Sequence, residues 1–473
     1  VYRSTIPITL SSQINSTTYL GDVRDSSSKN IRRSRLKQTN IYYKIDEAAA
    51  PLTPDRGLYV VTCTDNQLYY YAVTVTNLTT GKEVKTIISG QNNLLVPVAE
   101  TVADPQPVLQ DTVIWSTGEV ANEYSMWGNN QNLPHYPAMM DEGSYGFNFN
   151  LIKRGQATQF PLYVFYEGLN ATAIVGNGIE PFDDVTNCMI ITVDDWLPDP
   201  NPNYSTLAGG GTFWCCYHEK FDIYSKTNPI PTSGTVRTYM QNVYIKTIDW
   251  AHKYQPTDTS RTYLIGLSAG GFGALLTAVL IPQKIAGVYV VVSPIRLKAV
   301  KGDFQKMWGA PPTNLATNII DPSTGNTVLI WDLLDIKKMM RFDKNLSFPL
   351  IYSIHGKYDL TTGWSDKPAF YDSVQVLGMG GTYYWDQRQH DRTNANFLDS
   401  ETMPDLNLFQ TTKSYPAFSH CSVNQNPGNG TPSNGAPWGA INGYLTWDND
   451  NITDEHCNYA INVSVKDFYV GGV

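Results

Sequence analysis

The sequence predicts an α/β fold with a mostly parallel central sheet, flanked by an N-terminal β-sandwich and a β-rich C-terminal extension. Apolar strands alternate with helical patterns in the middle of the chain, which indicates a sheet covered on both faces. Only strands are expected before this region, and Asn, Gly and Pro are frequent after it. We therefore expect a β-sandwich over 1–105, an α/β domain over 106–400 and a β-rich extension over 401–473.

Composition limits the class of protein. The chain has 473 residues, 42% apolar and 16% charged, which is enough for large buried cores in two or three domains. A formal net charge of −9 gives little attraction for nucleic acid or anionic membranes, so neither is predicted as a partner. The 30 tyrosines, 11 tryptophans and many turn residues are typical of secreted β-rich proteins, and we expect a secreted, extracellular or periplasmic protein. One basic cluster is interpreted as a solvated loop or hairpin: Lys29, Arg32, Arg33, Arg35 and Lys37.

One uncharged stretch, residues 263–282, has the length of a membrane span. Glycines such as Gly266 and Gly270 interrupt it near its middle. A buried strand followed by a buried helix explains this pattern better than a membrane span does.

The cysteines lack the paired C-x-x-C spacing of a structural zinc site, and no metal is predicted. A disulfide between Cys421 and Cys457 is the first expectation, because both lie in the β-rich tail. A second expectation pairs Cys188 with Cys215 or Cys216. The six cysteines are Cys63, Cys188, Cys215, Cys216, Cys421 and Cys457.

The N-terminal region reads as short strands separated by turns. Residues 68–76 alternate between two faces, and 57–61 and 93–97 are further expected strands. A Tyr-rich strand followed by Gly81-Lys82-Glu83 resembles a fibronectin type III module, over roughly residues 40–105.

The middle of the chain predicts a parallel sheet whose functional residues lie where strands end. A long helix is expected over 236–252, and an Ala- and Leu-rich helix after Ser268. The expected strands are 160–166, 188–193, 262–266, 287–293, 349–355 and 382–385.

Ser268 is the predicted nucleophile. It lies in the pentapeptide Gly266-Leu267-Ser268-Ala269-Gly270, between an apolar strand and an apolar helix. Small neighbours allow a sharp strand-to-helix turn that lifts the serine hydroxyl into a cleft. The alternative is a glycine-rich turn with a buried serine.

Two further residues follow Ser268 in the order expected for an acid and a base. Asp359 comes just after the expected strand 349–355, although it could instead form a turn or cap a helix. His390 lies on a polar loop after the last expected strand and is the predicted base, with His420 as the alternative.

With these residues the sequence resembles an α/β-hydrolase, and more narrowly the secreted esterases related to polyhydroxybutyrate depolymerases and feruloyl esterases. The likeness covers roughly residues 125–395. It implies an oxyanion hole made by the N–H groups of Ala269 and Leu169. Glu167 departs from the family pattern, which often has His there, in the segment that carries Leu169.

The resemblance implies two-step acyl transfer on a carboxylic ester, with no metal or organic cofactor. The substrate class would be a plant cell-wall acetyl or feruloyl ester or a polyester, small or polymeric. Trp214 and Tyr217, in the insertion 196–231, and Trp364 after the acid are the expected substrate contacts, with ordinary core packing as the alternative for the insertion.

Two other functions fit the same pattern. A serine peptidase of the prolyl-oligopeptidase type shares the residue order, but no repeated β-propeller is found in the chain. A non-catalytic binding protein that kept the fold is the third hypothesis, and the complete set of Ser268, Asp359 and His390 argues against it.

Overall fold

The computed structural model describes residues 1–133, 136–169, 174, 185–198, 211–225, 227–297, 302–343, 345–391, 393–395 and 405–465. The chain divides into two compact units, one of residues 1–110 with 124–147 and the other of residues 111–123 with 148–473. The predicted domain boundary after residue 105 stays a prediction, and the one after residue 400 lies outside the described residues.

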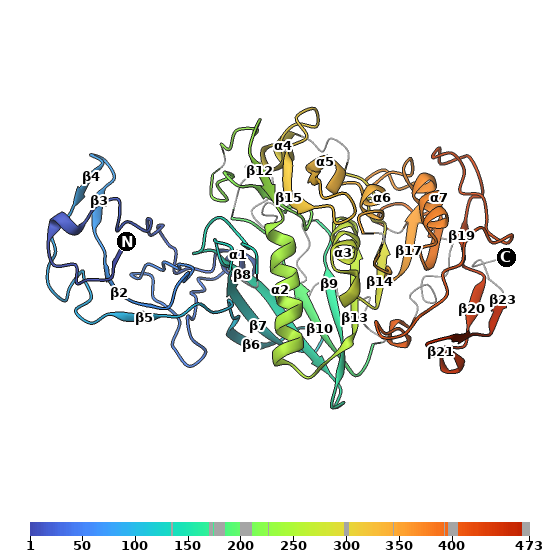
Figure 1. Cartoon of the computed structure of the whole chain (residues 1–473), viewed down its shortest axis with the longest axis horizontal. Helices are drawn as coiled ribbons and strands as arrows, with labels where there is room; N and C mark the ends of the chain where they lie inside the picture. Colours follow the sequence, from blue (N-terminus) through green and yellow to red (C-terminus); the bar gives the residue numbers. More distant parts are fainter. Residues whose placement is uncertain are drawn as a thin grey trace. The chain divides into compact units, whose positions relative to one another are not determined.

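Short antiparallel strands and one short helix make up the regular structure of the N-terminal unit (Figure 1). Strands β1, β2 and β5 form a three-stranded antiparallel sheet, and β3 and β4 form a hairpin. The fibronectin type III-like module stays a prediction. The elements are β1 (Tyr2–Ser4), η1 (Ser11–Gln13), α1 (Ile31–Leu36), β2 (Gln67–Ala72), β3 (Val75–Asn77), β4 (Lys82–Val84) and β5 (Val98–Glu100).

Two strand predictions in this unit were wrong. Residues 57–61 form no strand, because their backbone N–H groups bond to side chains: Leu58 N donates to Ser27 Oγ and Val60 N to Ser144 Oγ. Residues 93–97 contribute only an isolated bridge, and strand β5 starts just after them.

Three residues of the basic cluster, Arg32, Arg33 and Arg35, lie in helix α1, which corrects the interpretation of the cluster as a solvated loop or hairpin. Asn30 caps helix α1 by accepting a hydrogen bond from the backbone N–H of Arg33 at 3.1 Å. The side chains of Arg32 and Arg33 are buried, and Arg33 Nη2 donates to the carbonyl of Tyr124. Burial with hydrogen bonds gives these arginines a structural role.

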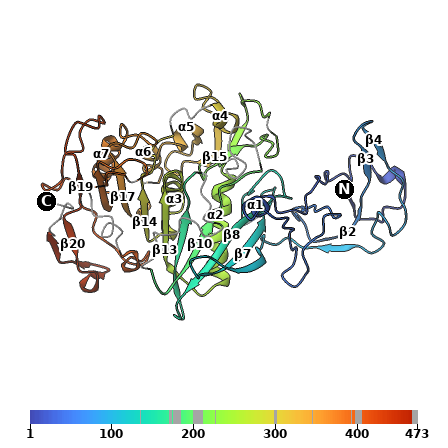
Figure 2. The same cartoon turned by 180° about the vertical axis from the view of Figure 1, so that it is seen from behind.

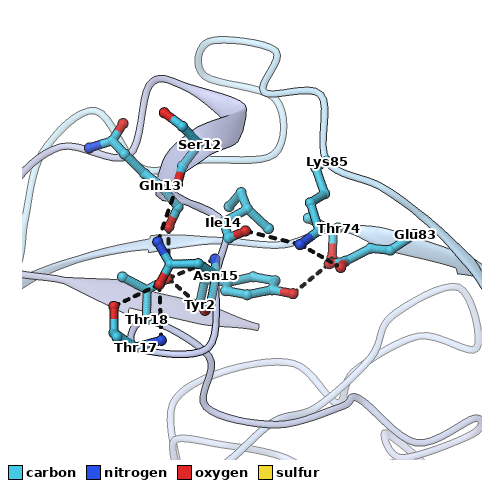
Figure 3. A network of polar contacts seen from close by, with 10 residues as sticks. All are labelled: Tyr2, Ser12, Gln13, Ile14, Asn15, Thr17, Thr18, Thr74, Glu83 and Lys85. Atoms are coloured by element: carbon cyan, nitrogen blue, oxygen red, sulfur yellow. Dashed lines mark hydrogen bonds and ion pairs between the residues drawn. The ribbon is translucent and has the colours of Figure 1, made fainter.

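A polar network joins β1, the β3–β4 hairpin and the loop after η1 (Figure 3). Glu83 accepts hydrogen bonds from Tyr2 Oη at 2.5 Å and from Thr74 Oγ1 at 2.6 Å. Lys85 Nζ lies 3.5 Å from Glu83 Oε2 and donates a hydrogen bond to the carbonyl of Ile14. Burial, together with the bond to Glu83, raises the pKa of Tyr2 to about 12.

Most strands of the large sheet belong to the second unit, and the order of the sheet is β19-β18-β17-β14-β13-β9-β10-β8-β7-β6 (Figures 1 and 2). Strands β10, β9, β13, β14, β17 and β18 pair in parallel, whereas β8 and β19 pair antiparallel at either side of this block. Together with the connecting helices this is the predicted α/β-hydrolase fold. The strands are β6 (Val108–Ile114), β7 (Val120–Trp127), β8 (Gly146–Arg154), β9 (Phe160–Tyr166), β10 (Cys188–Val193), β13 (Thr257–Leu267), β14 (Gly287–Val291), β17 (Leu350–Gly356), β18 (Gly381–Asp386) and β19 (Gly439–Ile441).

Helices pack against the parallel strands because their apolar residues need cover from water. The predicted long helix is α2, and α3, buried along its length except for Leu280, follows Ser268. The stretch 263–282 is therefore strand followed by helix, and no helix in the described residues is long and apolar enough to cross a membrane. The helices are α2 (Tyr239–Tyr254), α3 (Ala269–Leu280), η4 (Pro282–Lys284), α4 (Gly302–Trp308), α5 (Ile330–Leu333), α6 (Ile336–Met339) and α7 (Lys367–Leu377).

A smaller sheet and the C-terminal extension complete this unit. The extension joins the large sheet through β19, and its loop 424–436 is held by Lys357, whose Nζ donates to the carbonyls of Asn434 at 2.7 Å and Ala436 at 2.8 Å. The remaining elements are β11 (Tyr217–His218), β12 (Thr235–Arg237), β15 (Ala316–Ile320), β16 (Thr327–Leu329), η5 (Leu406–Leu408), β20 (Leu445–Trp447), η6 (Asn449–Asn451), β21 (Thr453–Glu455), β22 (Asn458–Ala460) and β23 (Val463–Val465).

The predicted disulfides are absent: all six cysteines lie in the described residues, and each is a free thiol. Cys188 points into the core, where its Sγ lies 3.8 Å from the carbonyl of Val185 and burial raises the pKa of its thiol to about 12. Cys421 and Cys457 share the tail without being bonded, because membership of one β-rich segment does not bring two Cα atoms within disulfide distance.

The tether at Lys357 predicts a stability effect. Lys357→Met leaves two carbonyls without their donor, so we expect the free energy of unfolding to fall by about 1–3 kcal/mol. Urea unfolding measures the loss, and limited proteolysis should show faster cleavage within 424–436. Lys413→Met changes an exposed lysine and is the control. Equal stability of the two variants would contradict the tether.

Candidate active site

Ser268 lies in a sharp turn between β13 and α3. Its backbone has φ 53° and ψ −120°, a conformation that residues with a side chain rarely adopt. The N–H of Ser268 donates to the carbonyl of Val291 at 2.9 Å, which fixes the turn to the end of the neighbouring strand β14. This strained geometry is the predicted strand-to-helix elbow.

The two glycines of the pentapeptide are required by contact distance. A Cβ atom added to Gly270 would lie 2.0 Å from the carbonyl oxygen of Tyr166 and 2.3 Å from that of Glu167. A Cβ added to Gly266 would lie 2.4 Å from the carbonyl oxygen of Gly270. The first turn of α3 therefore touches the backbone at the end of β9, which any larger residue would prevent.

Asp359 lies in the loop after β17 and is buried. Its Oδ1 accepts from the N–H groups of Thr361 at 2.8 Å and Thr362 at 3.0 Å, and its Oδ2 accepts from Thr362 Oγ1 at 2.7 Å. Burial favours the neutral acid, but hydrogen bonds from His390 and Thr362 outweigh it and lower the pKa of Asp359 to about 2. The carboxylate is thus charged at neutral pH.

His390 lies on the loop after β18 and bridges the other two residues. Its Nδ1 lies 2.8 Å from Asp359 Oδ2, and its Nε2 lies 2.9 Å from Ser268 Oγ. The His390 side chain is 29% exposed, so the site opens to solvent. The structure brings together the three residues singled out from the sequence, each at the carboxyl end of a different parallel strand.

The loop that carries His390 begins with a buried ion pair. Arg388 Nε and Nη2 donate to the two carboxylate oxygens of Asp386 at 2.8 and 2.9 Å, and neither side chain reaches solvent. The backbone N–H of Arg388 also donates to Asp386 Oδ1, at 2.9 Å. This paired fork fixes the direction in which the chain leaves β18.

The other histidines lie elsewhere. His420, the alternative base, is exposed, and its backbone N–H donates to Gln375 Oε1. His355 is a buried strand-end residue whose Nδ1 lies 2.8 Å from Tyr371 Oη, and burial holds its pKa well below the usual range. His218 and His252 bond to Ser233 and to threonines, respectively. His135 lies outside the described residues.

The two expected oxyanion donors flank Ser268. Ala269 is the first residue of α3, and the first N–H groups of a helix have no partner within it. Gly168, which precedes Leu169, is close enough that an added Cβ would lie 3.7 Å from Ser268 Cβ. The backbone that carries both N–H groups thus approaches the serine from two sides.

The three aromatic residues expected to contact substrate are interior. Trp214, Tyr217 and Trp364 are each buried, and Trp214 is 1% exposed. The Trp214 indole donates to the carbonyl of Glu167, and the Lys357 ammonium lies 5.4 Å from the Trp364 ring centroid. These side chains face other protein groups, which corrects their assignment as a substrate wall.

Sequence reasoning missed several supporting residues. Thr362 could have been found, because a hydroxyl three residues after an Asp at a strand end is a common turn pattern. Lys367, at the start of α7, carried no signal: it is buried, and its Nζ donates to the carbonyl of Ser293. Burial lowers the pKa of Lys367 to about 7, against the opposing effects of Asp359 and Asp366. Among the described side chains, no group of three or more His, Cys, Asp or Glu residues is placed to hold a metal ion.

Solved structures of several known proteins are similar to the structure of this chain. An S-formylglutathione hydrolase from Agrobacterium tumefaciens is 15% identical with a TM-score of 0.41, over 61% of this chain and 92% of that one. A CE1 ferulic acid esterase from Anaeromyces mucronatus is 12% identical with a TM-score of 0.35, over 59% and 86%. The dipeptidyl peptidase 4 of Porphyromonas gingivalis is 10% identical with a TM-score of 0.38, over 69% and 46%. No protein-family model and no curated protein matches the chain.

The close approach at Gly270 predicts a severe effect of a single methyl group. Gly270→Ala should lower the free energy of unfolding by about 4 kcal/mol or more, because backbone carbonyls cannot move aside as a flexible side chain can. Thermal and urea unfolding measure the loss. Gly287→Ala, on the neighbouring strand β14, is the control, since its added Cβ would meet its nearest neighbour at an ordinary contact distance of 3.4 Å. Similar stability of the two variants would refute the contact.

The low pKa of Asp359 predicts a pH-dependent contribution to stability. Because the pKa of this carboxyl is lower in the folded chain than its ordinary value of 3.8, its ionisation stabilises the fold above that value, and the contribution is lost as the pH falls toward about 2. Asp359→Asn should therefore be less stable than the wild type at pH 7, with a difference that shrinks on acidification.

Thermal unfolding at stepped pH between about 7 and 2 measures this difference. Thr362→Ala removes one of the hydrogen bonds to the carboxylate and should show the same trend with a smaller amplitude. A difference between wild type and Asp359→Asn that stays constant with pH would contradict the prediction.

Proposed function

We propose that this chain is a serine hydrolase that cleaves carboxylic esters through an acyl-enzyme. The observation that carries the proposal is the hydrogen-bonded series Asp359–His390–Ser268, with 2.8 and 2.9 Å between the joined atoms. Such a series can move a proton off the serine hydroxyl while the acid holds the imidazole. The strained turn at Ser268 presents that hydroxyl at the carboxyl ends of the strands.

In the first step Ser268 Oγ attacks the ester carbonyl carbon, and His390 Nε2 takes the hydroxyl proton. Asp359 keeps its negative charge and stabilises the imidazolium that forms, which suits a carboxyl whose pKa is about 2. The tetrahedral intermediate then collapses. The bond from carbonyl carbon to alcohol oxygen breaks, and the alcohol leaves with the proton from His390.

In the second step water replaces the alcohol. His390 takes a proton from water, the resulting hydroxide attacks the acyl carbon, and Ser268 regains its proton as the carboxylic acid leaves. We assign the N–H groups of Ala269 and Leu169 to the oxyanion of both intermediates. Loss of one such donor typically costs about 3–4 kcal/mol of transition-state stabilisation.

The substrate class extends the proposal. We assign an extracellular ester, either a plant cell-wall acetyl or feruloyl ester or a polyester, to a secreted enzyme. Support comes from the composition, with 12% aromatic and 16% charged residues, and from the opening of the site to solvent at His390. A screen of acetylated xylan, feruloyl esters and aliphatic polyesters separates these substrates.

The test is hydrolysis of p-nitrophenyl butyrate with and without the nucleophile. Ser268→Ala should lower kcat by about a thousandfold or more and abolish covalent labelling by a fluorophosphonate. Ser373→Ala, which changes a half-buried serine of α7, is the control and should keep both properties. His390→Ala should lose activity and His420→Ala should keep it.

Other outcomes would overturn the proposal. Undiminished turnover by Ser268→Ala would remove the serine from the reaction. Wild-type protein that neither hydrolyses esters nor takes the label would instead be a binding protein. Cleavage of peptide substrates without cleavage of esters would indicate a peptidase.

A further inference from the structure

A short turn, Thr212–Trp214, wraps around the carboxylate of Asp195, which follows strand β10. Asp195 Oδ2 accepts from the N–H groups of Thr212 at 2.8 Å and Trp214 at 2.9 Å, and Oδ1 accepts from Thr212 Oγ1 at 2.6 Å. Both oxygens of one carboxylate therefore organise the turn. Three convergent donors of this kind are what a desolvated carboxylate requires.

The turn is held in a conformation that its residues disfavour. Phe213 and Trp214 have φ of 52° and 60°, in the left-handed region that large side chains rarely adopt. Strain of this kind persists only where surrounding contacts over-determine the backbone, and it gathers at functional sites. Burial also raises the pKa of Asp195 to about 6, against the opposing hydrogen bonds from Thr212 and Trp214.

The strained turn places the Trp214 indole at the end of strand β9. The indole Nε1 donates to the carbonyl of Glu167 at 3.1 Å. The ring packs edge-on against Tyr166, with 5.1 Å between centroids, and lies 5.2 Å from the Tyr244 ring of α2. A buried aromatic ring with its one polar group bonded is a rigid fixture.

Helices α2 and α3 fix Trp214 from the other side. Gln241 Nε2 of α2 donates to the carbonyl of Trp214, and Gln241 Oε1 lies 2.8 Å from Thr277 Oγ1 of α3. Gly273 of α3 leaves space for the Trp214 side chain, because a Cβ added at this glycine would lie 2.3 Å from Trp214 Cβ. Helix α3, which begins directly after the nucleophile, thus also helps to fix the position of the Trp214 ring.

The carbonyl that receives the indole belongs to the segment proposed to bind the oxyanion. Glu167 immediately precedes Gly168 and Leu169, and its C=O lies in the same peptide plane as the N–H of Gly168. A Cβ added to Gly211, just before the turn, would lie 3.0 Å from Leu169 Cδ1 and 3.2 Å from Asp195 Oδ2. The turn therefore contacts the backbone of this segment through the Trp214 indole, and the glycine just before the turn lies beside the Leu169 side chain.

We propose that Asp195 and Trp214 are positioning residues that hold the backbone of residues 167–169 in place as one half of the oxyanion hole. This inference rests on the proposed function. Neither residue contacts the reacting atoms: Asp195 shapes the turn, and Trp214 transmits that shape to the peptide beside Ser268. A donor displaced by a fraction of an ångström stabilises the transition state less while leaving ground-state binding nearly unchanged.

The experiment compares Asp195→Asn and Trp214→Phe with the wild type on p-nitrophenyl butyrate. Both variants should lower kcat by about 10- to 100-fold and change KM by less than about twofold, because the donor acts on the oxyanion. The inhibition constant of a trifluoromethyl ketone, whose adduct with the serine carries an oxyanion, should weaken in parallel with kcat/KM.

The matched control is Tyr263→Phe, on the strand that leads to the nucleophile. It removes a buried hydroxyl that donates to the carbonyl of Phe409 at 2.6 Å, so it also loses a buried side-chain bond to backbone. It should lower Tm while keeping kcat within about twofold of the wild type. All rates are compared well below each variant's Tm, and Asp195→Asn, nearly isosteric, guards against misfolding of Trp214→Phe.

A double variant tests whether the two residues act in one path. Its kcat should equal that of the worse single variant, because either change already frees the segment. A multiplicative loss would overturn the coupling, and variants that lower Tm but keep kcat, as Tyr263→Phe does, would overturn the positioning role. Failure of the proposed function is distinguishable, since the wild type would then take no fluorophosphonate label.

Discussion

The contact between the first turn of α3 and the end of β9 is the constraint on which the candidate site depends. Gly270 meets the carbonyls of Tyr166 and Glu167 at a distance that no side chain would permit. The contact places the start of the helix, the strained serine and the segment after β9 in one small volume. Because these parts are backbone, their relative positions vary little once the sheet has formed.

The remaining groups reach this volume from neighbouring strands of the same sheet. Parallel pairing of β13, β14, β17 and β18 brings their carboxyl ends to one edge, so the acid and the base need only short loops. Each loop has its own restraint. Threonine hydroxyl and amide groups fix Asp359, and the buried Asp386–Arg388 pair fixes the approach to His390.

The sequence predicted those features that depend on residues close together in the chain. The parallel strands, the helix after Ser268 and the choice of His390 over His420 could be predicted because apolar runs and Gly-rich turns have local causes. The strands β6 and β7 at the edge of the sheet were not predicted, and the burial of Arg33 could not be, since its partner Tyr124 is distant in the sequence. The aromatic residues were assigned wrongly, because the sequence alone does not distinguish a tryptophan that faces substrate from one that, like Trp214, donates to a backbone carbonyl.

The tether from Lys357 to the carbonyls of Asn434 and Ala436 has a consequence for the order in which the chain is made. Ser268, Asp359 and His390 all leave the ribosome before the residues that anchor the loop beside the acid. Those anchors follow Asp359 by 75 residues (434 − 359) and 77 residues (436 − 359), which at about 5–20 residues per second is roughly 4–15 seconds of synthesis. A nascent chain thus carries its nucleophile and base well before its acid loop is secured, and the site is complete only once residues 434–436 have folded back onto Lys357.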